Sequence, residues 1–151
     1  MSLCTKSDAA VISISEAWSL LQQFYWDLDH FDYSRLGSYF DERSVLHRKG
    51  AELVGLPQIN GTLVTRDPHV VTRHVLSVPV HKKGFENTLA IGGYMTVYRQ
   101  ASAGSDERPL FSSGPWRLYD VHSEWRWMDG APVVSSLRMS PIYEFESTGR
   151  M

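Results

Sequence analysis

Three aspartates lie within WDLDHFDY, the most aromatic stretch of the chain. A carboxylate among aromatic rings needs a hydrogen-bond donor or stays protonated, because moving a lone charge out of water is costly. If this stretch ends an amphipathic helix, about 100° per residue places Asp29 near the apolar side that carries Trp18 and Tyr25. Asp27 falls on the opposite side, where we expect it to be solvated, and Asp32 is expected to cap the following segment. Asp29 is therefore the aspartate predicted to point inward.

The strand-like sequence VVTRHVLSVPVHKK supplies a partner for Asp29. Alternation places His74 in an otherwise apolar row with Thr72 and Leu76, facing the predicted helices. A carboxylate that holds an imidazole fixes its tautomer and makes it a better base, which is the chemistry of general base catalysis. We therefore take Asp29 and His74 as candidate catalytic residues.

Two simpler interpretations of the same residues stay open. A single histidine in a core is more often structural than catalytic. Asp29 could equally accept hydrogen bonds from backbone N–H groups at the end of its helix. In either case the two residues would stiffen the core without doing chemistry.

Further candidates for ligand contacts come from the aromatic helix and from a late strand. Trp18 and Tyr25 share the apolar side of the helix with Asp29. Tyr119 and Ser123 belong to a row predicted to face the concave side of the sheet, where their hydroxyl groups could reach a pocket. Aromatic rows of this kind are also typical of a core, so a role in binding depends on where a pocket lies.

The sequence contains no motif for a metal or a cofactor. HExxH, CxxC, P-loop and dinucleotide-binding patterns do not occur. His69 and His81 lie an odd number of residues from His74, so on a strand they project from the other face and cannot share a metal with it. We therefore expect neither a metal nor a cofactor.

Helices are predicted first along the chain and strands afterwards. Ser13 and Glu16 form a capping box at the start of the aromatic helix, Asp32 opens a second short helix, and Pro57 starts a third. A short strand or hairpin is expected at 45–54. From residue 69 the apolar period falls to two, which predicts four strands at roughly 70–82, 88–100, 115–128 and 132–144. This order indicates an α+β fold with three helices packed on one face of a curved, mostly antiparallel sheet.

Length and composition predict one globular domain in a chain of 151 residues. We expect a flexible N-terminus at 1–12, the domain at 13–145, a short tail at 146–151, and the highest mobility of the domain in the loop 101–114. The formal net charge of −2 and the scattered basic residues give no sign of a nucleic-acid partner. With neither a long apolar segment nor a signal peptide evident, we expect a cytoplasmic protein without a membrane partner.

Three segments carry a resemblance to a known family: DLDHFDYSRLGSYF, then TRHVLS, then DGAPVVSSLR near the end. Their order and spacing resemble the SnoaL-like group of the nuclear transport factor 2-like superfamily, across about residues 12–145. The resemblance implies a strongly curved sheet wrapped by three helices into a cone with an internal pocket, usually in a dimer. In relatives such as polyketide cyclases and scytalone dehydratase, the acid of the first D-x-x-D and the histidine of the T-x-H strand are functional. These positions match Asp29 and His74 here.

The sequence also departs from these relatives. Scytalone dehydratase uses a second histidine on the following strand, and the strand LAIGGYMTVYRQ has none. Its tyrosine positions correspond here to Leu28 and to the vicinity of His47 or Arg48, so its dehydration chemistry is not inherited. The small subunits of aromatic-ring-hydroxylating dioxygenases resemble this chain in their closing strand, here near Arg138, and do no chemistry themselves.

Two functional classes follow. The first is a cofactor-independent isomerase, cyclase or dehydratase that acts by proton transfer on a small apolar or aromatic molecule, with His74 as base and Asp29 as its orienting group. The second is a non-catalytic binding or assembly subunit like those of the dioxygenases. We favour the first because both residues are predicted to point inward. Outward apolar residues, including Trp116 and Tyr94 or Met95, further predict a homodimer formed through the outer face of the sheet.

Overall fold

The computed structural model describes residues 12–84, 87–101 and 114–146. Most of the loop expected to be the most mobile therefore lies outside the described residues, as do 1–11 and 147–151 of the two expected flexible ends. Within the described residues, no helix has the length and hydropathy needed to cross a bilayer.

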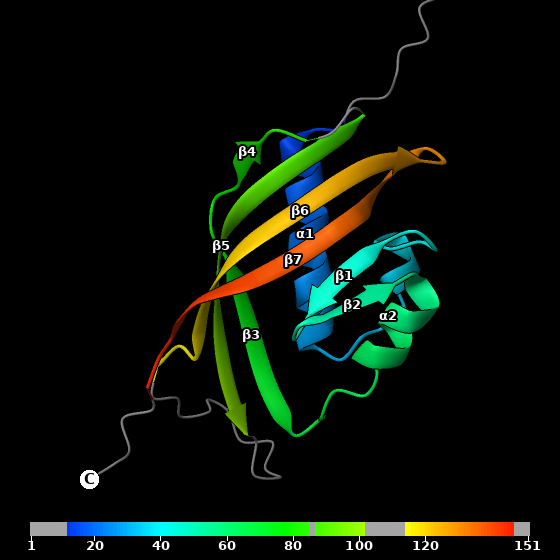
Figure 1. The fold of residues 1–151 in the computed structure, drawn as a ribbon. Helices are drawn as coiled ribbons and strands as arrows, with labels where there is room; N and C mark the ends of the chain where they lie inside the picture. Colours follow the sequence, from blue (N-terminus) through cyan, green and yellow to red (C-terminus); the bar gives the residue numbers. More distant parts are fainter. Residues whose placement is uncertain (1–11, 85–86, 102–113, 147–151) are drawn as a thin grey trace, which may run out of the picture.

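The described part of the chain has two α-helices, one turn of 3-10 helix and seven strands (Figure 1). The helical elements are α1 (Ile14–Asp29), η1 (Leu36–Ser38) and α2 (Leu56–Leu63). The strands are β1 (Val45–Arg48), β2 (Ala51–Val54), β3 (Val70–Leu76), β4 (Val80–Lys82), β5 (Thr88–Ala101), β6 (Arg117–Met128) and β7 (Ala131–Glu144). The α+β class and the predicted order of elements are confirmed, apart from the second helix.

The seven strands form one curved sheet in the order β2-β1-β7-β6-β5-β3, and β4 pairs with β5 beside β3. All pairings are antiparallel except that of β1 with β7. Helix α1 lies across one face of the sheet, while α2 packs beside β1 and β2 (Figure 1). The mostly antiparallel sheet is therefore confirmed, and its curvature leaves a space between the helices and the strands.

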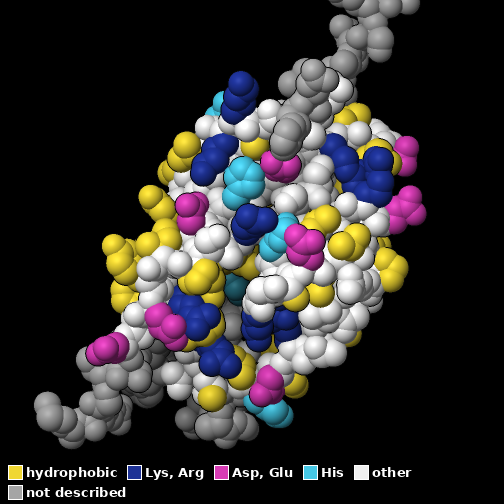
Figure 2. All heavy atoms as spheres, in the orientation of Figure 1, with side chains coloured by type: hydrophobic (Ala, Val, Ile, Leu, Met, Phe, Trp, Pro, Cys, Tyr) yellow, Lys and Arg dark blue, Asp and Glu magenta, His cyan; other side chains and the backbone are white. Residues whose placement is uncertain are grey.

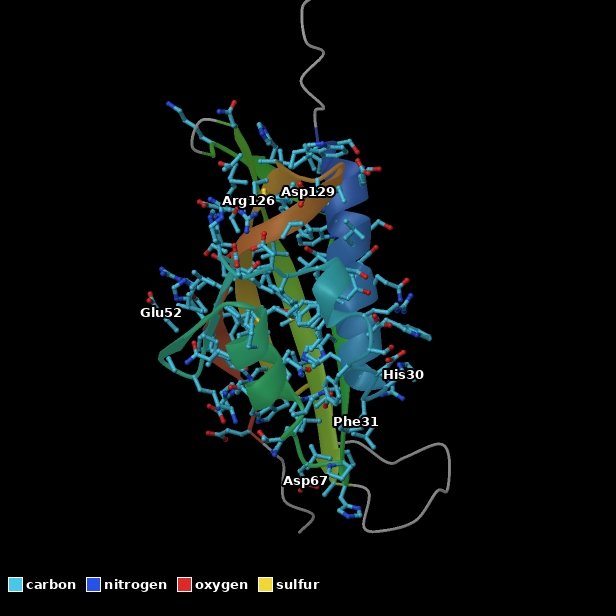
Figure 3. The ribbon with its side chains drawn as sticks, turned by 90° about the vertical axis from the view of Figure 1, so that its right-hand side faces the viewer. His30, Phe31, Glu52, Asp67, Arg126 and Asp129 are labelled. Atoms are coloured by element: carbon cyan, nitrogen blue, oxygen red, sulfur yellow. The ribbon has the colours of Figure 1, made fainter. Side chains whose placement is uncertain are left out.

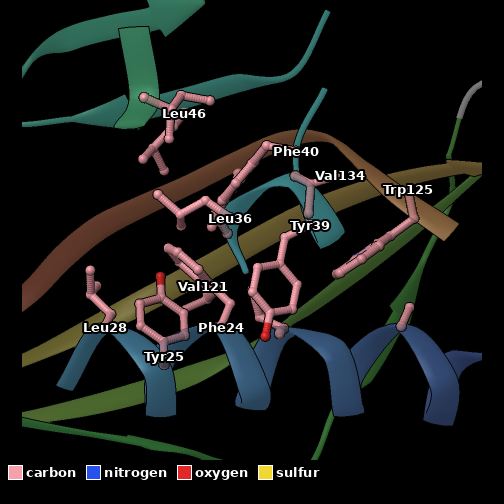
Figure 4. Close-up of a cluster of buried hydrophobic side chains, with 14 of the residues drawn as sticks. Phe24, Tyr25, Leu28, Leu36, Tyr39, Phe40, Leu46, Val121, Trp125 and Val134 are labelled. Carbon is pink, nitrogen blue, oxygen red and sulfur yellow. The ribbon is translucent and has the colours of Figure 1, made fainter. Parts of the chain in front are cut away.

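Helix α1 begins where the capping box predicts. The Ser13 hydroxyl accepts a hydrogen bond from the backbone N–H of Glu16 at 3.1 Å, which satisfies a donor that the first turn leaves free. The apolar side of α1 then buries Trp18, Leu21 and Tyr25 against the sheet. Figure 4 shows the aromatic side chains of α1 packed against those that follow η1 and against the strands.

The predicted second helix is instead a single 3-10 turn, Leu36–Ser38. Asp32 accepts hydrogen bonds from the backbone N–H and the hydroxyl of Ser34, at 3.0 and 2.6 Å, which makes a local turn rather than a helix N-cap. Gly37 and Ser38 have low helix propensity, and the buried Tyr39 follows the 3-10 turn directly. The segment therefore stays irregular and folds back over α1.

This fold-back overturns the expectation that Asp27 is solvated. Asp27 is 2% exposed, and its carboxylate accepts hydrogen bonds from Arg35 and from the Tyr39 hydroxyl, the latter at 2.6 Å. Periodicity placed Asp27 on the side of α1 opposite Trp18 and Tyr25. It could not show that residues 33–40 cover that side, so the burial of Asp27 was missed.

The predicted strand 70–82 is two strands, broken between Leu76 and Val80. Pro79 lies in the break, and proline has no N–H to give to a ladder. The Ser77 hydroxyl accepts a hydrogen bond from the backbone N–H of Tyr94 at 2.9 Å, which fills the gap in the pairing with β5. The inward face predicted for Thr72 and His74 lies entirely on β3, before the break.

Candidate active site

Asp29 and His74 are hydrogen bonded to each other. Asp29 is the last residue of α1, and His74 lies in the middle of β3. Nδ1 of His74 lies 2.6 Å from Oδ1 of Asp29, and the backbone N–H of His74 donates to Oδ2 at 2.8 Å. The end of the helix thus brings one carboxylate onto both the backbone and the ring of the same histidine.

Thr72 and Arg66 extend this hydrogen-bonded group. The Thr72 hydroxyl donates to Oδ1 of Asp29 at 2.9 Å, and the guanidinium of Arg66 donates to the Thr72 oxygen at 2.8 Å and to the carbonyl of Leu28. Both carboxylate oxygens of Asp29 therefore face donors. A carboxylate in this position requires the Nδ1 atom of His74 to carry its proton.

The remaining nitrogen of His74, Nε2, has no hydrogen-bond partner among the described residues. The ring stacks on Tyr25 with centroids 4.8 Å apart and an angle of 30° between the planes. The His74 side chain is 11% exposed, which leaves it in contact with the cavity described next. With Nδ1 protonated, Nε2 is the nitrogen that can accept a proton.

A cavity of about 500 Å³ lies beside the pair. Its walls come from the end of α1, the turn between β1 and β2, the connection from α2 to β3, and the strands β5 to β7. Figure 2 shows a hollow on this face of the molecule with Lys and Arg side chains on both sides and a histidine at a deeper level. The lining residues are Tyr25, Leu28, His47, Arg48, Lys49, Gly50, Thr65, Arg66, Asp67, Val70, Thr72, His74, Met95, Val97, Arg99, Trp116, Arg117, Tyr119, Met139 and Pro141.

Two tyrosine hydroxyl groups reach this cavity. Burial raises the pKa of Tyr25 well above its usual value, and the nearby Tyr119 and Asp29 raise it further, so Tyr25 stays a neutral donor. Its hydroxyl lies 2.8 Å from the sulfur of Met139, which is a weak acceptor. The Tyr119 oxygen accepts a hydrogen bond from Arg117 at 3.4 Å, and its own proton remains available to a ligand.

Tyr25 and Tyr119 are the two predicted ligand contacts that line the cavity, and three others do not. Trp18 is 4% exposed and donates its indole N–H to the carbonyl of Ser77 at 3.0 Å. Ser123 is buried, donates to the carbonyl of Ile91 at 3.2 Å and accepts from Trp125 at 2.9 Å. Both side chains point inward as predicted, but they lie in the packed core and not in the lining of this cavity.

Arg138 is likewise outside the cavity, and Trp116 lies inside it against expectation. Arg138 is exposed on β7, paired with His122 on β6. Trp116 was expected on the outer face of a strand, but β6 begins only at Arg117, so strand alternation does not fix the direction of the Trp116 side chain. Its ring lies in the cavity lining, 4.1 Å from the guanidinium carbon of Arg117.

The structure also brings together cationic residues that we did not single out as ligand contacts. Arg48 ends β1, Arg66 follows α2, and Arg99 and Arg117 lie near facing ends of β5 and β6. All four line the cavity. Their separation in sequence gives no motif, and only the HRKG turn after β1 offered a local sign of a basic loop. Among the described residues, no three His, Cys, Asp or Glu side chains are grouped as a metal site would need.

Comparison with known proteins gives similarity in structure but not in sequence. No protein-family model matches the chain, and no curated protein matches it. ActVI-ORFA from Streptomyces coelicolor is 16% identical with a TM-score of 0.65, over 84% of this chain and 95% of that one. A protein named as a candidate scytalone dehydratase from Novosphingobium aromaticivorans is 15% identical with a TM-score of 0.65, over 91% and 93%. An NTF2-like protein with a cystatin-like fold from the same organism is 14% identical with a TM-score of 0.65, over 85% and 80%.

These similarities define the class of fold. A curved sheet wrapped around a long helix, with a cavity between them, is the cystatin-like α+β architecture of these neighbours. The chain therefore has the nuclear transport factor 2-like fold, as the resemblance of its sequence motifs predicted.

Proposed function

We propose that the protein is an enzyme that transfers a proton on a small molecule bound in the cavity, as an isomerase, a cyclase or a dehydratase does. The observation that carries this proposal is the pair formed by Asp29 and His74. The carboxylate fixes Nδ1 of the ring at 2.6 Å, while Nε2 has no partner among the described residues and belongs to a side chain of the cavity wall. A base held in one tautomer beside a pocket is the arrangement that general base catalysis needs.

The chemistry follows from these positions. An acidic C–H of the substrate lies against Nε2 of His74, which accepts the proton. Asp29 stabilises the imidazolium that forms. The negative charge left on the substrate oxygen is stabilised by hydrogen bonds from the hydroxyl groups of Tyr119 and Tyr25, which line the same cavity. Return of the proton to another carbon gives an isomer, and loss of a hydroxide from the same intermediate gives a dehydrated product.

The structural neighbours support this proposal at the level of fold. One of them is named as a candidate scytalone dehydratase, and it covers 91% of this chain. Because one fold hosts many functions, the choice of reaction depends on the residues of this cavity. The reaction class therefore rests on the geometry of His74 and not on the neighbour.

A second candidate function is a binding or assembly subunit without chemistry of its own. The observation that favours it is the full set of hydrogen bonds to Asp29, which tie the end of α1 to Thr72 and to the backbone of His74 in β3. Such contacts stabilise the fold even if no proton is ever transferred. In this case the same cavity would hold a ligand that leaves unchanged.

Exchange of carbon-bound hydrogen distinguishes the two functions. The protein is incubated in D2O with a panel of small ketones, enones and aromatic acids, and deuterium incorporation is followed by NMR. We expect enzyme-dependent incorporation for at least one compound, and a loss of roughly a hundredfold in His74→Gln. His81→Gln is the matched control, because His81 is exposed on β4 and lies outside the cavity lining. Equal exchange rates in the wild type and His74→Gln would contradict a catalytic role.

A further inference from the structure

We propose that the cavity takes an organic anion, namely a small aromatic or unsaturated carboxylic acid whose carboxylate binds the guanidinium of Arg48. This inference rests on the proposed function and names the substrate class for the same site. It changes the sequence-based expectation of an apolar substrate.

Arg48 is a cation in the cavity wall without a hydrogen-bond or ion-pair partner in the described part of the chain. It ends β1, immediately before the tight turn in which Lys49 and Gly50 both have positive φ, 50° and 76°. Its side chain is partly buried, and it makes no hydrogen bond or ion pair with any described residue. A guanidinium has five N–H donors, and those of Arg48 can meet an acceptor bound in the cavity.

The electrostatic surroundings of Arg48 also favour the binding of an anion. Burial lowers the pKa of Arg48, and the positive charge of Arg66 lowers it further. The nearby Tyr33, Tyr119 and Tyr25 raise the pKa of Arg48, but they offset burial and the charge of Arg66 only in part. A bound carboxylate would remove both penalties at once.

The charge of the lining as a whole is strongly unbalanced. Five cationic side chains line the cavity, and in the described part of the chain the lining has one acid, Asp67, which is exposed. Asp29 lies behind this wall, already engaged by Thr72 and His74. Because the whole protein has a formal net charge of −2, the excess of positive charge is local to the cavity. The cationic lining residues are Arg48, Lys49, Arg66, Arg99 and Arg117.

The guanidinium groups of Arg66 and Arg117 already have protein partners. Arg66 donates to Thr72 and to the carbonyl of Leu28. Arg117 pairs with Glu144 at 3.2 Å, and its guanidinium carbon lies 4.1 Å from the ring centroid of Trp116. Lys49 and Arg99 are exposed, and the Arg99 guanidinium carbon lies 5.2 Å from the ring centroid of Trp116. Arg48 is the partly buried arginine of the lining that has no hydrogen-bond or ion-pair partner among the described residues, so we take it as the anchor for the anionic group.

The rest of the lining suits the body of an aromatic or unsaturated acid. Met95, Val97, Trp116 and Met139 supply apolar surface on the strands, and Tyr25 stacks beside His74. A cavity of about 500 Å³ has room for one or two rings and excludes a polyanion such as nucleic acid. An acid held in this way places its carbon skeleton between Arg48 and the base, and the cationic wall stabilises the second negative charge that proton removal creates.

Matched pairs of acids and amides test this inference. Calorimetric titrations compare 2-naphthoate with 2-naphthamide, and cinnamate with cinnamamide, because each pair differs in charge and hardly in shape. For the wild type, we expect each acid to bind about tenfold or more tightly than its amide. In Arg48→Gln the ratio falls to near one while the affinity for the amide is kept, which shows that the cavity is still formed. Arg138→Gln is the control, because Arg138 is exposed on β7 outside the cavity and should keep the full ratio.

The outcomes separate this inference from the proposed function. Equal affinities for acid and amide in the wild type, no binding of either acid at millimolar concentration, or an unchanged ratio in Arg48→Gln would overturn it, whatever the catalytic activity. A preference for acids that depends on Arg48 supports it even if no hydrogen exchange is found. His74→Gln should keep the preference and lose exchange, because the anchor and the base are different residues.

Discussion

At the scale of single residues, Asp29 is the group on which the site depends. Each of its two carboxylate oxygens accepts a hydrogen bond from β3: Oδ1 from the Thr72 hydroxyl and the His74 ring, and Oδ2 from the His74 backbone. Both oxygens are thus used as acceptors. A side chain with one acceptor and one donor cannot replace it.

Asp29→Asn is expected to lower both the stability of the protein and its rate of hydrogen exchange on the substrate. The amide group must point its NH2 either at the backbone N–H of His74 or at the Thr72 hydroxyl and the ring, which sets a donor against a donor. We expect urea unfolding to show a loss of roughly 1–3 kcal/mol, because a buried donor is left unsatisfied. Hydrogen exchange on the substrate should fall as well, since an amide cannot stabilise the imidazolium. Asp67→Asn, at an exposed position, should leave stability within about 0.5 kcal/mol of the wild type. Unchanged stability in Asp29→Asn would contradict the hydrogen bonds described here.

The pairing of Asp29 with His74 could be predicted from periodicity, because each residue lies on a regular element with a clear apolar face. The same reasoning placed Trp18 and Ser123 on inward rows, which is correct, but both side chains are buried and hydrogen bonded within the core. Periodicity gives the direction of a side chain and not the depth at which a cavity begins. The role of Arg48 as an anchor was not predicted for another reason. It lies on a strand of four residues, which is too short for its pattern to assign the two faces.

At the scale of elements, the pair formed by Asp41 and Arg126 joins the chain before β1 to β6. Arg126 donates to both oxygens of Asp41, at 2.7 Å for the contact of Nη1 with Oδ2. These hydrogen bonds hold the pKa of the Asp41 carboxyl at about 2, below its ordinary value of 3.8. Figure 3 shows Arg126 at the opposite end of the molecule from Asp67, which lies in the cavity lining. A substitution in this pair is therefore expected to change the stability of the fold and to leave the cavity unchanged.

A depressed pKa in the folded state predicts how stability changes with acid. The ionised carboxylate is favoured by folding, so the contribution of Asp41 is complete above the unfolded pKa of 3.8 and is lost as pH falls through about 2. The shift corresponds to roughly 2 kcal/mol. Urea unfolding of the wild type and of Asp41→Asn should therefore show a difference that is constant from pH 7 to pH 5 and shrinks between pH 4 and pH 2. A difference that stays constant down to pH 2 would show that the pair is not ionic.

The ends of helices and strands are where the structure differs most from the prediction made from the sequence. The helix α1 and the long strands β5 to β7 could be predicted because each has a long, regular pattern. The predictions of the second helix and of the face of Trp116 were wrong, because the segment of Gly37 and Ser38 forms a single 3-10 turn and because β6 begins only after Trp116. Asp27 was misplaced for the same reason, since the segment that covers it is irregular.

At the scale of the whole molecule, the outer face of the sheet carries a patch of exposed apolar and aromatic side chains beside the polar row of Asp120, His122 and Glu124. The ladder pairs Val75 with Thr96, Thr96 with Leu118 and Leu118 with Tyr143, so these side chains share one face. Tyr94 is two residues from Thr96 and therefore lies on the same face. The exposed fractions are 55% for Val75, 57% for Tyr94 and 62% for Tyr143. This surface supports the homodimer predicted from the sequence, which stays a prediction.

Sedimentation at micromolar concentration tests the dimer. We expect the wild type to sediment as a dimer, and Tyr94→Lys to weaken the association by about tenfold or more, because it buries a charge in an apolar interface. Val64→Lys is the control, since Val64 is 47% exposed but lies at the end of α2, outside the sheet. A wild type that is monomeric, or dissociation caused equally by both variants, would contradict a dimer through the outer face.

The overall architecture could be predicted because the order of elements survives even where single elements differ. The charge of the cavity could not, because its cations come from β1, the end of α2, β5 and β6 and meet only in the folded chain. A net charge of −2 conceals such a local excess. The proposed substrate class therefore depends on residues that only the folded chain brings together, whereas the proposed base is a single residue.

The protonation of His74 tests the central claim most directly and needs no substrate. Nitrogen-15 chemical shifts of the histidine rings, recorded at a pH where the ring is neutral, distinguish the two tautomers. His74→Gln identifies the signal by its loss. The account predicts that Nδ1 carries the proton, facing Asp29 across 2.6 Å, and that Nε2 is unprotonated towards the cavity. A proton found on Nε2 with Nδ1 bare would contradict it, because Asp29 would then hold the proton and His74 would present no base to a substrate.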